Sequence, residues 1–131
     1  LRRYPITLGA QPTGQKERAG DGRTPEGVFR VCSKNAGSAN HRFLGIDYPN
    51  REAARRGLRS GLISGGEALA ISKSHDEGRC PPWTSAVGGG IGLHGSGGDL
   101  ERSAGCVALL DEHVDELFEV LRIGDPIEIL P

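Results

Sequence analysis

The chain has 131 residues, with 16 basic and 17 acidic side chains and 21 glycines. This length supports one domain with its own core but not two. A net charge of −1 gives no electrostatic reason to expect nucleic acid as a partner, and no apolar run is long enough to span a membrane.

Short strands joined by tight connections are predicted for the first part of the chain. Strands are expected over three segments that are apolar or alternate apolar with polar residues: 4–8, 28–32 and 43–48. Loops are expected over residues 11–23 and 33–40. Thr24-Pro-Glu-Gly27 has turn chemistry, because proline fixes φ at the second turn position.

Helices are predicted further along the chain. Residues 51–59 form a short helix with Asn50 as its N-cap, and residues 65–74 form a second. Asp111 caps the clearest helix, whose apolar residues recur at helical spacing: Val114, Leu117, Phe118 and Leu121. His113 is expected to be exposed on its polar side, and residues 126–130 form a closing strand.

Two glycine-rich motifs contain the candidate chemistry. Gly88-Gly-Gly-Ile-Gly-Leu-His-Gly95 places His94 twelve positions before Cys106 of Ser103-Ala-Gly-Cys-Val-Ala108. A thiol attacks as thiolate, which a nearby imidazole can generate, and bare glycine backbone can hold a developing oxyanion. The pattern predicts a cysteine enzyme. A buried structural cysteine and an unrelated loop histidine form the alternative interpretation.

Three motifs in the same order resemble the catalytic domain of L,D-transpeptidases, which has the YkuD-type fold. They are Gly20-Asp-Gly-Arg-Thr-Pro-Glu-Gly-Val-Phe29, Ile91-Gly-Leu-His-Gly95 and Ser103-Ala-Gly-Cys-Val-Ala-Leu109, with Pro81-Pro-Trp83 ahead of the glycine run. The resemblance covers nearly the whole chain and implies a single domain over residues 1–131. The implied fold is mainly β, with mixed, curled sheets in a sandwich, a C-terminal helix and a closing strand. The N-terminal strand of the family is expected to be trimmed.

The resemblance also implies residue roles. Cys106 corresponds to the nucleophile, which attacks a peptidoglycan stem peptide; His94 corresponds to its base, and the carbonyl of Gly95 orients the imidazole. Gly105 and Cys106 supply backbone N–H groups for the oxyanion. Residues expected to bind substrate are Ser103, Arg102, Trp83 and Thr24. The chemistry needs no metal and no cofactor, and carbapenem-type inhibitors are expected to acylate the cysteine.

This chain departs from the common family pattern in two positions. Ala104 stands where many members have histidine, and Ala108 stands where they have arginine. Loss of a guanidinium removes a fork that can clamp a carboxylate through two hydrogen bonds. We therefore expect another residue to hold the substrate, with Arg102 a candidate by position.

The remaining cysteines leave alternatives open. If Cys106 stays free, Cys32 and Cys80 form one disulfide or remain two unpaired thiols. Cys80 with His75, Asp76 and Glu77 offers metal-binding atoms, but without the paired spacing of zinc sites.

Transfer of a stem peptide to an amine acceptor is the first functional hypothesis. A hydrolase on the same site, either an L,D-carboxypeptidase or an amidase that releases wall-attached protein, is the second. A non-catalytic wall-binding module with an inert Cys106 is the third. All three place the protein in the periplasm or cell envelope.

Overall fold

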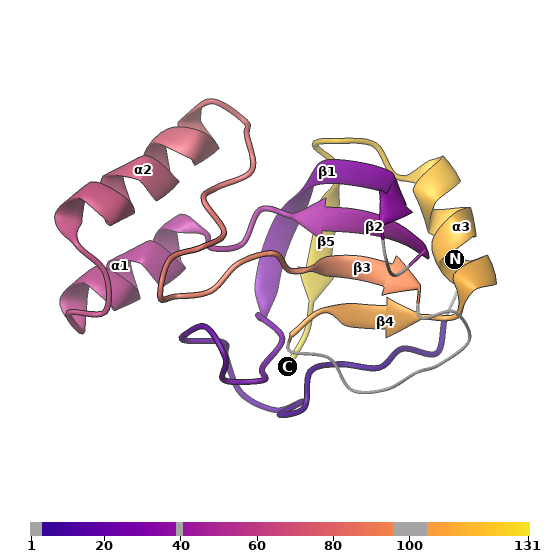
Figure 1. Ribbon diagram of the computed structural model, residues 1–131, viewed down its shortest axis with the longest axis horizontal. Helices are drawn as coiled ribbons and strands as arrows, with labels where there is room; N and C mark the ends of the chain where they lie inside the picture. The colour runs from indigo at the N-terminus through magenta and orange to yellow at the C-terminus, as the bar shows by residue number, and fades with distance from the viewer. Residues whose placement is uncertain (1–3, 39–40, 96–104) are drawn as a thin grey trace.

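A computed structural model of the protein describes residues 4–38, 41–95 and 105–131. Within these ranges the strands form one mixed five-stranded sheet, in the order β4-β3-β2-β1-β5 (Figure 1). The strands are β1 (Gly27–Ser38), β2 (His41–Ile46), β3 (Gly92–Gly95), β4 (Val107–Leu109) and β5 (Pro126–Ile129). β3 and β4 run parallel, and the other neighbouring pairs are antiparallel.

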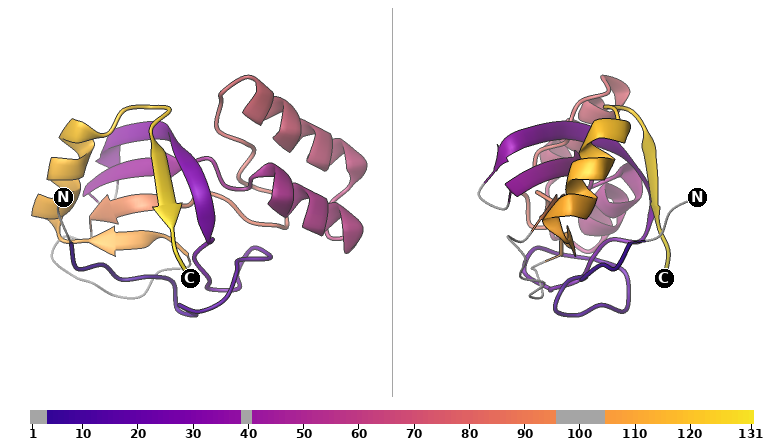
Figure 2. Two further views of the ribbon diagram at one scale, coloured as in Figure 1. Left: turned by 180° about the vertical axis from the view of Figure 1, so that it is seen from behind. Right: turned by 90° about the vertical axis from the view of Figure 1, so that its right-hand side faces the viewer.

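The sheet curls along β1, its longest strand. Residues 27–30 of β1 pair with β5, whereas residues 31–38 pair with β2, and the register shifts between Val31 and Ser33. Such an irregularity bends a strand, and β5 consequently crosses the direction of β3 and β4 (Figure 2). The curl encloses a core of buried side chains: Phe29, Ile46, Tyr48, Ala53 and Ile91. The mainly β, curled architecture is as predicted.

The predicted loop over residues 33–40 is wrong for residues 33–38, because β1 continues to Ser38; residues 39 and 40 lie outside the described residues. Beyond residue 30 this strand is paired on one side by β2, and residues 35–37 are exposed. Polar residues are therefore compatible with a strand here, although their composition indicated a loop.

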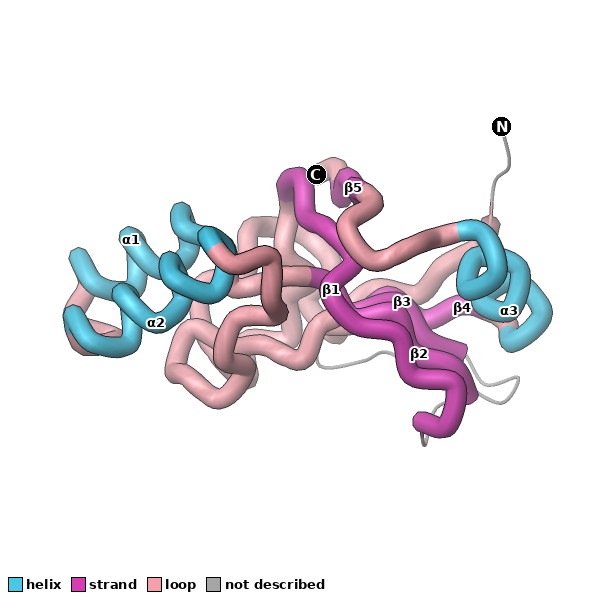
Figure 3. Tube along the Cα trace, turned by 90° about the horizontal axis from the view of Figure 1, so that it is seen from above, coloured by secondary structure: helices cyan, strands magenta, loops and turns pink. Residues whose placement is uncertain are grey.

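Helices α1 (Arg51–Arg59) and α2 (Gly65–Asp76) form a hairpin at one end of the sheet (Figure 3). As predicted, the Asn50 side chain caps α1 by accepting the N–H of Ala53 at 2.9 Å. A reciprocal Ser64 and Glu67 capping box starts α2. The two helices are joined by a small core of their own: Ala54, Ile63, Ile71 and Val87.

Helix α3 (Asp111–Val120) lies at the opposite end of the sheet (Figure 3). Its Val114 packs with Val107 and Leu109 of β4. Lys34 donates from Nζ to the carbonyls of Phe118 and Leu121 and so satisfies the helix C-terminus. Asp111 is the first helical residue and not the cap as predicted; Leu110 occupies the N-cap in an extended conformation.

The predicted strand over residues 4–8 is reduced to one isolated bridge between Thr7 and Ala108. Pro5 lacks an N–H and therefore cannot extend a ladder. Two hydrogen bonds of 2.8 Å nevertheless hold Thr7 against β4.

Cys32 and Cys80 form a disulfide, with their Cα atoms 5.1 Å apart. The alternative of two free thiols is therefore wrong. The bond ties β1 to the segment after α2. In the described residues no helix is both long and apolar enough to cross a membrane.

Candidate active site

His94 lies on the face of the sheet opposite α3. It pairs with Phe43 of β2 on one side and with Ala108 of β4 on the other. Side chains of paired residues project from the same face, and successive residues alternate. Leu93, Val107 and Leu109 therefore project toward α3, as their shared cluster with Val114 shows. His94 therefore projects from the other face, where it is largely buried.

The tautomer of His94 follows from one hydrogen bond. Its Nδ1 lies 2.7 Å from the carbonyl oxygen of Gly95. A carbonyl only accepts, so Nδ1 must donate, and Nε2 of a neutral ring is left as an acceptor. The ring is 9% exposed. This geometry is the one expected for Gly95.

Cys106 directly precedes β4, the strand that pairs with the His94 strand. Leu93 pairs with Val107 and His94 with Ala108. The register therefore places His94 beside Ala108, two residues after Cys106. The histidine and cysteine motifs thus meet on adjacent parallel strands, with Cys106 just outside the paired residues.

Gly105 makes the turn that presents Cys106. Its φ is +149°, and an added Cβ would lie 2.8 Å from the Arg23 carbonyl oxygen and 2.9 Å from Ile91 Cδ1. A side chain at this position would be strained and would clash. The sequence therefore needs glycine directly before the nucleophile candidate.

The Cys106 thiol is less acidic than a free cysteine thiol. Burial raises the pKa of Cys106, against the opposing effects of the Gly92 N–H and the Lys16 charge. Sγ donates to the Gly90 carbonyl oxygen at 3.4 Å. Formation of a thiolate at neutral pH therefore requires a base at the moment of reaction.

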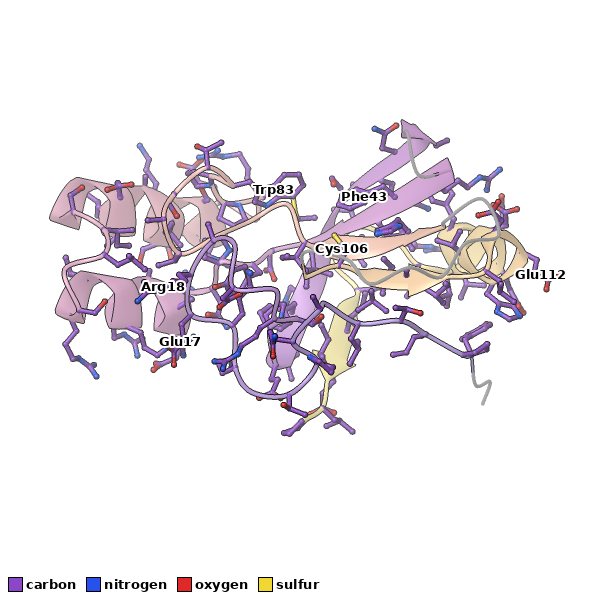
Figure 4. All side chains as sticks on the ribbon, turned by 60° about the horizontal axis from the view of Figure 1, so that its bottom comes forward. Glu17, Arg18, Phe43, Trp83, Cys106 and Glu112 are labelled. Atoms are coloured by element: carbon purple, nitrogen blue, oxygen red, sulfur yellow. A yellow bond between two sulfur atoms is a disulfide. The ribbon has the colours of Figure 1, made fainter. Side chains whose placement is uncertain are left out.

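A pocket of about 260 Å³ opens beside the sulfur. Its walls include Trp83, Gly88, Gly89, Gly90, Ile91, Gly105, Cys106 and Lys16. The Trp83 ring stands edge-on to Phe43, with centroids 6.2 Å apart, and Figure 4 labels both residues together with Cys106. The backbone of Trp83 passes so close to Gly89 that a Cβ added to Gly89 would lie 2.4 Å from the Cα of Trp83. The glycine run thus allows two segments to meet along one wall.

Lys16 is the pocket residue that sequence analysis missed. It is 2% exposed, and its Nζ lies 2.8 Å from Asp21 Oδ1. Lys16 comes from the polar loop over residues 11–23, on which Figure 4 labels Glu17 and Arg18. Lysine is rarely buried without a partner, and the sequence signal was limited to an acidic residue five positions later.

Asp21 organises that loop. Its carboxylate accepts Lys16 Nζ and the backbone N–H groups of Glu17, Arg18 and Arg23. Burial by itself would raise the pKa of Asp21, but these four hydrogen bonds outweigh it and lower the pKa to about 2. The carboxylate therefore stays ionised and holds Lys16 against the pocket.

The other predicted substrate-binding residues have different outcomes. Trp83 lines the pocket with Cys106. Thr24 is 4% exposed and is not among the lining residues; its hydroxyl accepts the N–H of Gly9 at 3.0 Å. Thr24 thus holds Gly9, whose backbone passes close to Gly105, and does not line this pocket. Arg102 and Ser103 lie outside the described residues.

The group considered for zinc has other contacts. Cys80 is in the disulfide and offers no thiolate. His75 lies 2.8 Å from the Pro49 carbonyl through Nε2 and 3.5 Å from Asp47 through Nδ1. The Asp47 hydrogen bond raises the pKa of His75.

His113 is partly buried and not fully exposed as predicted. Its side chain is 24% exposed, and its ring lies 5.2 Å from that of Tyr4 between centroids. It packs at the opposite end of the sheet from the helical hairpin, on α3.

Solved structures share this fold. The Campylobacter jejuni helical cell shape determining protein Pgp2 is 23% identical, with a TM-score of 0.54, over 92% of this chain and 34% of that one. Bdellovibrio bacteriovorus Bd1075 is 19% identical, with a TM-score of 0.59, over 99% and 38%. An L,D-transpeptidase from Mycobacterium smegmatis is 14% identical, with a TM-score of 0.51, over 100% and 49%.

These likenesses establish the fold, and the chain spans between a third and a half of the length of those proteins. A search of curated proteins finds no match. The sequence profile of the L,D-transpeptidase catalytic domain, YkuD, matches residues 1–129. With the fold and the placement of its motifs, this match shows that the chain belongs to the YkuD family of L,D-transpeptidase catalytic domains.

Proposed function

We propose that this protein is a cysteine acyltransferase of peptidoglycan stem peptides, with Cys106 as nucleophile and His94 as base. The proposal rests chiefly on one observation: a glycine turn presents Cys106 at a pocket, at the start of the strand that pairs with the His94 strand. The hydrogen bond from His94 Nδ1 to Gly95 supports it, because Nε2 is then the nitrogen free to take a proton.

The reaction follows in two steps. Nε2 of His94 takes the thiol proton as Sγ attacks the scissile carbonyl carbon, and backbone N–H groups at Gly105 and Cys106 hold the oxyanion. The carbon–nitrogen bond then breaks, and His94 returns the proton to the leaving amine, which departs as the terminal D-amino acid. An amine of a second stem attacks the thioester to form a cross-link and release the thiol. Water in its place gives hydrolysis.

Acylation followed by partitioning tests the reaction. We expect a stem tetrapeptide to form a thioester on Cys106, seen by intact mass, and the Cys106→Ala variant to form none. Adding an amine acceptor should accelerate loss of the thioester and yield the transpeptidation product. Decay that ignores the acceptor and yields hydrolysed peptide alone would instead assign the carboxypeptidase or amidase activity.

The base is tested separately. We expect His94→Asn to slow acylation by on the order of 100-fold or more, the contribution typical of general base catalysis. Because burial raises the pKa of Cys106, the variant should regain part of its rate as the pH rises. Carbapenem acylation gives a second measurement of the same thiol. If neither carbapenem nor a thiol-directed reagent modifies Cys106 in the folded wild type, the protein is a binding module.

We also propose that the protein works outside the cytoplasm, in the periplasm or cell envelope. The Cys32–Cys80 disulfide supports this location, since such bonds persist in oxidising compartments. Fractionation of cells that produce the full-length protein should recover it, with this bond oxidised, in the envelope fraction. Recovery in the cytoplasmic fraction with both thiols free would contradict the proposal.

A further inference from the structure

The Lys16 ammonium lies close to Gly105, the residue that precedes the candidate nucleophile Cys106. A Cβ added at Gly105 would be 3.5 Å from Lys16 Nζ. Lys16 and Cys106 line the same pocket. The side chain is nevertheless almost completely buried, so a cation is held at the pocket wall and not in bulk solvent.

This ammonium has unused hydrogen-bonding capacity. It carries three N–H donors, and Asp21 accepts one of them. No other acceptor for Nζ is found among residues 4–38, 41–95 and 105–131. Burying donors without acceptors is unfavourable. A ligand oxygen in the pocket would remove that cost.

The bond to Asp21 leaves hydrogen-bond donors of the Lys16 ammonium unused. The two Asp21 oxygens also accept three backbone N–H groups, which use much of the acceptor capacity of the carboxylate and stabilise part of its negative charge. The carboxylate therefore positions Lys16 without occupying all of its donors. A second anion can bind the remaining face of the ammonium.

The proposed reaction brings such an anion to this place. In a donor whose last amino acid leaves, the free carboxylate is attached to the carbon next to the scissile nitrogen. When the scissile carbonyl lies at Cys106 Sγ, this carboxylate is necessarily within a few bonds of it. Ala108 provides no guanidinium for it.

We propose that Lys16 binds the free C-terminal carboxylate of the donor peptide and so restricts the enzyme to donors whose terminal residue is unblocked. This inference rests on the proposed acyl transfer and specifies its donor. Asp21 serves as the positioning residue for Lys16.

Two donor peptides that differ in one group provide the test. One stem tetrapeptide ends in a free carboxylate and the other in a neutral carboxamide. We expect wild-type kcat/KM for acylation of Cys106 to be roughly 10- to 100-fold higher with the carboxylate, the range for one charge-assisted hydrogen bond. Lys16→Met should lower the rate with the carboxylate donor more than the rate with the carboxamide donor, by a similar factor, because loss of the Lys16 charge also raises the pKa of Cys106 and slows both donors alike.

Two further variants separate charge from folding. Lys73→Met makes the same substitution at an exposed position of α2 and should retain the wild-type preference. Lys16→Met combined with Asp21→Asn removes both charges, so that no unpaired carboxylate is left; it should also lose the preference. Circular dichroism and thermal unfolding establish that each variant is folded.

Several results would overturn the inference. Equal wild-type rates with both donors would do so, whatever the variants show. An equal loss on both donors in Lys16→Met would assign Lys16 to the oxyanion or to structure. Loss of the preference in Arg102→Gln but not in Lys16→Met would assign the clamp to Arg102. If neither donor acylates wild-type Cys106, the proposed function itself fails, and this inference fails with it.

Discussion

Replacing Asp21 by asparagine should destabilise the protein in a pH-dependent way. The pKa of Asp21 falls from 3.8 to about 2 in the folded chain, because the hydrogen bonds from Lys16 and three backbone N–H groups outweigh burial. Each pKa unit corresponds to about 1.4 kcal/mol. The ionised carboxylate thus contributes about 2 kcal/mol to the free energy of unfolding at neutral pH.

The direction of the pH dependence follows from the sign of the shift. The folded pKa is the lower one, so the contribution is complete above the unfolded pKa of 3.8 and is lost as the pH falls toward 2. We expect Asp21→Asn to lower the free energy of unfolding by about 2 kcal/mol at pH 7, and by roughly half as much at pH 3.

Urea denaturation of wild type and variant at both pH values measures this difference. Asp76→Asn is the matched control: Asp76 pairs with Arg51, but its side chain is 70% exposed. Surface pairs contribute little, so the control should cost less than about 1 kcal/mol at either pH. An Asp21→Asn effect that matches the control, or that is equal at pH 7 and pH 3, would refute the reasoning.

Two other substitutions test the framework of the site. Cys32→Ala combined with Cys80→Ala removes a cross-link between residues 48 apart and should lower the free energy of unfolding by about 4 kcal/mol in chemical denaturation. An unchanged denaturation midpoint would contradict this. Gly105→Ala adds a clash to an unfavourable φ and should cost more than about 2 kcal/mol by the same measurement. Gly61→Ala is its control, since φ there is +77° with no atom near the added Cβ; equal losses in the two variants would show that the clash is relieved.

Local patterns were sufficient for much of the fold. The cap at Asn50, the apolar spacing in α3 and the alternation in residues 28–32 involve neighbours within a few residues, so each was readable from the sequence. Residues 33–38 and 4–8 were misread for one reason. Whether a polar or proline-containing segment forms a strand depends on the strand beside it, which the sequence does not display.

The same division applies to the candidate site. The sequence by itself determined the chemical groups: one cysteine after a glycine, one histidine before another, and a motif order that indicated the family. The tertiary structure decided which of them meet. The register of β3 against β4 brings the His94 and Cys106 motifs onto adjacent strands, and loop packing buries Lys16 at the pocket that Cys106 lines. Pairing register and the burial of a charge arise from contacts between residues far apart in the chain, and therefore only the folded protein could reveal them.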